Sequence, residues 1–194
     1  MFASAYLTLA SIIQGVALAA LVQRVEGTYG SYDATCWVMV AATFLAILVI
    51  WHEYLVMVIA YEWTPSLIDS VVPFVFVAAE VFTAHFVAHD VRNWLFAYSA
   101  IFAAGFMAWL VTWRQTASGT KRTRPGDQHV VVFRRVRAAL VLGSCGLALA
   151  AGLLYNVLGL YRVSLLLTGG ILVLGLLFVG ASIRFWDRVA SAGR

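Results

Sequence analysis

Residues 51–69 have the sequence WHEYLVMVIAYEWTPSLID, and they decide how the chain is organised. One apolar run ends here, Pro65 interrupts any continuous helix, and a second apolar run begins at Asp69. Four side chains in this stretch can carry charge near neutral pH: His52, Glu53, Glu62 and Asp69. The stretch is therefore a boundary between two membrane-type segments that retain ionisable groups.

The composition is that of a membrane protein. The 194 residues are 63% hydrophobic and 11% charged, whereas soluble domains carry about a quarter charged residues. A membrane-spanning helix needs roughly 20 apolar residues. Six runs meet this need: 2–23, 36–60, 69–88, 94–113, 138–158 and 163–183. The runs are continuous rather than alternating, which favours helices over a barrel. We predict an all-α integral membrane protein with six transmembrane helices, short loops and one polytopic domain over residues 1–194.

The distribution of Lys and Arg predicts the orientation. Ten of these residues fall on the side that holds both chain ends and the segment 114–137, and three fall on the other side. Basic residues favour the cytoplasm, so we expect both termini and this segment to be cytoplasmic, in a bacterial-type inner membrane. No basic residue precedes Arg24, so we expect residues 2–23 to be a retained first helix rather than a cleaved signal peptide.

Residues 114–137 are the one clear break in composition, and we expect a basic cytoplasmic loop there between the fourth and fifth helices. Candidates for binding lipid headgroups, or a soluble or membrane partner protein, are Lys121, Arg122, Arg124, Arg134 and Arg135. The segment HVVVF, residues 129–133, has a β-type composition and suggests a short hairpin or an extended arm. Phe133 is the one aromatic residue in this loop, so nucleic-acid binding is not expected.

Ionisable residues within the second and third helices form the candidate site. A charge inside a span costs at least about 2.5–3.5 kcal/mol on insertion scales. Asp69 and Glu80 are eleven residues apart and so share one helical face, whereas His85 and His89 fall on the other side. Glu80 falls close to the membrane midplane. The candidate transport cluster comprises Glu80, Asp69, His52, Glu53 and Glu62.

Three members also have a structural interpretation. Asp69 falls in the first turns of the third helix, where Thr64 or Ser66 can cap the helix. Glu62 can also be explained as a charge at the membrane interface. Glu80 can also be explained as a neutral, hydrogen-bonded carboxylic acid. The zinc-protease pattern H-E-x-x-H is absent from the sequence. We identify no catalytic or metal-binding residues and predict no cofactor.

Small residues recur at intervals of four in several runs, as in Ser11, Gly15 and Ala19. Such faces let helices approach closely, either within one subunit or between subunits of a homo-oligomer. Membrane lipids and further copies of the chain are the expected partners.

Three functions fit these patterns. The first is an oligomeric channel or transporter that moves a small cation or protons past the second and third helices. The second is a non-catalytic subunit that anchors or couples a larger assembly through the basic loop. The third is a haem- or metal-dependent redox protein. The first explains the acidic residues by a single cause, and we favour it.

The predicted orientation can be tested with reporter fusions. A reporter active only in the cytoplasm should give signal when it is fused after Arg194, because ten of the thirteen basic residues fall on that side. A silent cytoplasmic reporter together with an active exported one would reverse the topology.

Overall fold

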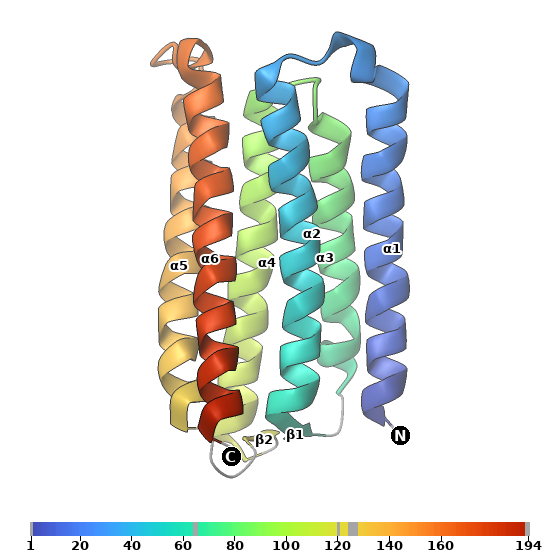
Figure 1. The fold of residues 1–194 in the computed structure, drawn as a ribbon, viewed down its shortest axis with the longest axis vertical. Coiled ribbons are helices and arrows are strands. Elements are labelled where there is room, and N and C mark those ends of the chain that lie inside the picture. Colours follow the sequence, from blue (N-terminus) through green and yellow to red (C-terminus); the bar gives the residue numbers. More distant parts are fainter. Residues whose placement is uncertain (1, 64–65, 120, 124–127, 193–194) are drawn as a thin grey trace.

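Six long helices run side by side along one direction in the computed structural model of the chain (Figure 1). The structure describes residues 2–63, 66–119, 121–123 and 128–192. The helices within these residues are α1 (Phe2–Thr28), α2 (Ala34–Ala60), α3 (Leu67–Phe86), α4 (Val91–Ala117), α5 (Gln128–Leu154) and α6 (Ser164–Ala192). Short 3-10 helices, η1 (Tyr29–Ser31) and η2 (Leu160–Val163), lie between α1 and α2 and between α5 and α6.

The prediction of a polytopic helical membrane protein is confirmed. Helices α1, α2, α3, α4 and α6 are each long and apolar enough to cross a membrane. The apolar part of α5 within the described residues, Ala138–Leu154, is shorter. The observed helices extend beyond most of the predicted runs because a helix satisfies its own backbone hydrogen bonds and continues readily past the hydrocarbon.

The predicted boundaries of the basic loop are wrong. Helix α4 continues to Ala117 and α5 begins at Gln128, so the connection is much shorter than residues 114–137. Arg134 and Arg135 belong to α5, and Arg124 lies outside the described residues. The segment HVVVF is helical, since it leads directly into the apolar part of α5 and takes up the helical hydrogen bonding of that segment.

A two-stranded antiparallel ladder closes one end of the bundle. Strand β1 (Tyr61–Trp63) follows α2, and strand β2 (Lys121–Thr123) follows α4. Glu62 and Arg122 are register partners at its centre. We call this the ladder end of the bundle; α1 begins there and α6 ends there (Figure 1). Strand β2 therefore lies upstream of residues 129–133, where the β-type segment was predicted. Its partner, β1, lies in the connection between α2 and α3.

The helices form a closed ring in the order α1, α2, α6, α5, α4, α3, with α3 returning to α1. Helix α3 also touches α2, but its larger interfaces are with α1 and α4. Helices α2 and α3 are thus less closely paired than their short connection suggests. In this ring α2 lies opposite α4, and side chains of the two helices face each other across the interior.

Polar side chains cap three of the helices. Asp33 accepts the Cys36 N–H at 2.8 Å at the start of α2, and this hydrogen bond lowers the pKa of the Asp33 carboxyl. Asp90 accepts the Arg92 N–H at 2.8 Å at the start of α4. Ser66 caps α3, which confirms one of its two predicted capping residues. These caps satisfy N–H groups that no helical turn can reach.

Two hydrogen bonds join α2 to α4 in the half of the bundle away from the ladder. The indole N–H of Trp94 donates to the Thr43 hydroxyl at 3.0 Å, and the Tyr98 hydroxyl donates to the Ala42 carbonyl at 3.2 Å. All four residues are buried. The two helices are therefore tied together on one side of the bundle centre.

Replacing Thr43 with Val should destabilise the protein. The substitution keeps the shape of the side chain but leaves the buried Trp94 N–H without its acceptor, which should cost about 1–2 kcal/mol of unfolding free energy. Unfolding in mild detergent measures the loss. The matched control is Ser11→Ala, which removes the acceptor of the exposed Trp51 indole and should change stability far less. Equal effects would show that burial of the Trp94 bond is unimportant.

Candidate functional site

Glu80 is completely buried and its partner comes from α1. Its side chain has 0% exposure, and the Gln14 Nε2 group donates to Glu80 Oε2 at 3.2 Å. The remaining oxygens of the pair, Gln14 Oε1 and Glu80 Oε1, are buried with no hydrogen-bond partner among the described residues. Glu80 faces protein and not lipid, as the cost of a carboxyl in hydrocarbon requires.

Sequence reasoning missed Gln14. The signal was present, because Gln14 is an amide in the middle of an apolar run, where an unpaired polar group is costly. Its significance depends on α1 packing against α3, and no sequence pattern indicated that neighbour.

Asp69 is part of the structural framework at the ladder end. Its Oδ2 accepts from the Ser66 backbone N–H at 2.8 Å and from the Ser66 hydroxyl at 2.7 Å, which completes a capping box. Gln115 of α4 donates to the same carboxylate at 3.0 and 3.2 Å. Asp69 therefore fixes the start of α3 and ties it to the end of α4.

Two buried tyrosines lie between Asp69 and Glu80. The rings of Tyr6 and Tyr54 contact edge to face with centroids 5.9 Å apart. Tyr6, Tyr54 and Asp69 line the same cavity, and the Tyr54 ring also contacts Phe76, which lies one turn from Glu80 on α3. Asp69, Tyr6, Tyr54 and Glu80 thus form a series of groups able to bind protons, which we call the acid–tyrosine series. It leads from the ladder end into the bundle.

The predicted stripe on α3 is confirmed, although the five candidate residues do not form one cluster. Asp69 and Glu80 share the buried face of α3, whereas His85 and His89 are exposed. Glu53 lines a cavity between α2 and α4, and His52, half-buried on α2, is not among the residues that line it. Glu62 lies in β1.

For the basic residues at the ladder end, the structure describes the backbone alone. Lys121 and Arg122 form part of β2, and Arg134 and Arg135 lie in the first turns of α5. The side chains of these four residues and of Glu62 lie outside the described part of the structure. Their proposed binding of lipid headgroups or a partner protein stays a prediction.

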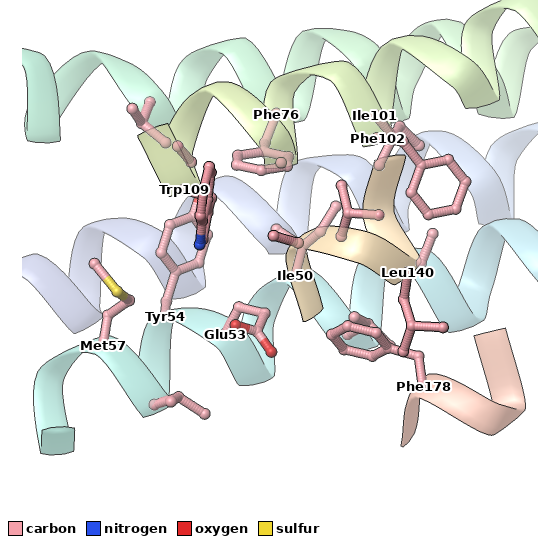
Figure 2. Close-up of a pocket in the computed structure, with 18 of the residues that line it drawn as sticks. Ile50, Glu53, Tyr54, Met57, Phe76, Ile101, Phe102, Trp109, Leu140 and Phe178 are labelled. Atoms are coloured by element: carbon pink, nitrogen blue, oxygen red, sulfur yellow. The ribbon is translucent and has the colours of Figure 1, made fainter. Parts of the chain in front are cut away.

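The cavity lies inside the helix ring, in the half of the bundle nearer the ladder. It has a volume of about 190 Å³, and α2, α4, α5 and α6 supply most of its walls. Figure 2 shows Glu53 and Tyr54 of α2, Trp109 of α4 and Phe178 of α6 around the same space. Tyr98, whose hydroxyl donates to the Ala42 carbonyl of α2, also lines the cavity.

Within residues 2–63, 66–119, 121–123 and 128–192, no group of three or more His, Cys, Asp or Glu residues could hold a metal ion. Comparisons of the chain with protein-family models, with curated proteins and with solved structures find no match.

The Gln14–Glu80 pair can be tested by a double-mutant cycle. Gln14→Leu should lower the unfolding free energy by about 1–3 kcal/mol, because it leaves the buried Glu80 without a donor. Adding Glu80→Leu should recover most of this loss, because it replaces the buried carboxyl that Gln14→Leu left unpaired with an apolar side chain. Gln23→Leu changes an exposed residue of the same helix and is the matched control. Strictly additive effects would show that the two side chains are not coupled.

Proposed function

We propose that this protein is a membrane transport protein that moves protons through the interior of its helix ring. The observation that carries the proposal is Glu80, a carboxyl group with 0% exposure that is held by a single amide. Ionisable residues inside membrane spans commonly belong to ion pathways or proton relays.

The surroundings of Glu80 favour a proton over a metal cation. Ca²⁺ and Mg²⁺ require about six or more oxygen ligands. Among the described residues, Glu80 has one hydrogen-bond partner, Gln14. A protonated Glu80 carries an O–H group that can serve the unpartnered Gln14 Oε1. The pair is thus chemically suited to hold one proton and to pass it on.

The acid–tyrosine series supplies groups that can relay this proton. Asp69 lies at the ladder end, the rings of Tyr6 and Tyr54 contact each other, and Tyr54 packs on Phe76, one turn from Glu80 on α3. Hydroxyl groups both donate and accept hydrogen bonds, as a relay requires. We propose that protons enter from the ladder end, which the distribution of basic residues assigns to the cytoplasm.

A homo-oligomer in a lipid bilayer is part of the proposal. The small-residue face of Ser11, Gly15 and Ala19 is exposed on the outside of α1, and nothing lies within 4 Å of a side chain built at Gly15. Such a face suits close approach by a second subunit. Large apolar side chains exposed elsewhere on the helices suit contact with lipid.

Proton flux into proteoliposomes tests the function. Glu80→Gln keeps the volume and the hydrogen-bonding capacity of the side chain but removes its titration, so it should reduce flux to the level of protein-free vesicles. Glu26→Gln makes the same chemical change at an exposed residue and should conduct like the wild type.

If the Glu80→Gln variant folds and conducts like the wild type, the role of Glu80 is structural and not in transport. Wild-type flux no greater than that of empty vesicles would also count against conduction. Either result would favour the alternative function, a membrane subunit that couples an assembly through its basic end.

A further inference from the structure

The cavity between α2 and α4 has the size of a small ligand site. Its volume is about 190 Å³, somewhat more than the about 150 Å³ of an engineered apolar cavity that binds benzene. Aliphatic and aromatic side chains form most of its surface, including Ile50, Phe76, Ile101, Phe102 and Phe178 (Figure 2). A single ring with a small substituent fits a space of this size and character.

Two hydrogen-bond donors lining this cavity have no acceptor. The Tyr54 hydroxyl and the Trp109 indole N–H are both buried, and neither has a hydrogen-bond partner among the described residues. The Tyr54 side chain is only 4% exposed. Glu53 lines the same cavity, but its carboxylate accepts from neither donor. Buried polar groups are nearly always hydrogen-bonded, so the two donors indicate an acceptor on a bound molecule.

The Trp109 ring is held in place. It stacks on Phe106 with centroids 5.5 Å apart and on Trp113 with centroids 6.4 Å apart. These contacts fix the indole plane. Because turning the N–H away would break them, a bound molecule is the better way to satisfy this donor.

The charges of the lining exclude an anion. Glu53 and Asp69 both line the cavity, and no Lys, Arg or His does so within the described part of the chain. An ammonium group would suit Glu53 but would leave the Trp109 N–H unpaired, since an ammonium group has no lone pair. A neutral ligand with an acceptor oxygen satisfies both donors.

We propose that this cavity is a binding site for a neutral, membrane-soluble molecule that carries a carbonyl-type oxygen on a single ring. The apolar walls bind the ring, and Trp109 and Tyr54 donate to the oxygen. The site shares Tyr54 with the proposed proton relay, but its binding does not use Glu80.

Three probes of similar size test the proposal. Acetophenone carries a carbonyl oxygen, α-methylstyrene has the same shape with a methylene group in its place, and benzyltrimethylammonium is a cation. Equilibrium dialysis against the purified protein in detergent, with protein-free micelles as the blank, measures the binding of each. Acetophenone should bind most tightly.

Trp109→Phe removes one donor and keeps an aromatic ring. It should weaken acetophenone binding by roughly five- to tenfold, the value of about one hydrogen bond, and leave α-methylstyrene binding unchanged. Trp37→Phe, at an exposed residue outside the cavity, should change neither. Tyr54→Phe provides a second variant that loses a donor if Trp109→Phe does not fold.

Acetophenone binding that is equal in the wild type and in the donor variants would overturn the proposal. Tighter binding of benzyltrimethylammonium than of acetophenone would also overturn it and would make the cavity a cation site.

Discussion

Hydrocarbon offers no hydrogen-bond partner, so each polar group within the spans must find one inside the protein. This constraint determines which helices are neighbours. The Gln14–Glu80 pair requires α1 against α3, and the Trp94–Thr43 bond links α2 to α4 across the ring. Gln115 reaches from α4 to the capped start of α3 at Asp69. Since apolar contacts between helices resemble contacts with lipid, these polar pairs specify the arrangement more sharply than the surrounding Leu and Val side chains do.

The sequence predicts well what depends on local chemistry. Apolar length identifies the six helices, the 100° turn per residue places Asp69 and Glu80 on one face, and Ser66 is recognisable as a cap. It predicts poorly what depends on distant neighbours. The start of α5 was missed because the basic composition of residues 128–137 resembles that of a loop. Gln14, Trp109 and the β1–β2 pairing were missed because each acquires its role from a segment far away in the chain.

Two interior features meet at Tyr54. Its ring contacts Tyr6 and Phe76, and the same side chain lines the cavity. Tyr54 therefore belongs both to the proposed proton relay and to the proposed ligand site. A molecule that accepts a hydrogen bond from Tyr54 would engage the hydroxyl that the proposed relay uses. If both proposals hold, occupancy of the cavity would affect proton transfer through Tyr54.

The ladder also has a consequence for biogenesis. Strand β1 is synthesised before α3, whereas its partner β2 follows α4. The segment after α2 must therefore wait at the membrane surface until two further helices have been inserted. Both strands have been synthesised before α5, so they can pair and link the ends of α2 and α4 at that stage. Glu80 and Gln14 both lie within the part of the chain that is already complete, but the cavity still lacks the walls that α5 and α6 supply. The order of translation therefore allows the Gln14–Glu80 pair to form before the cavity can be complete.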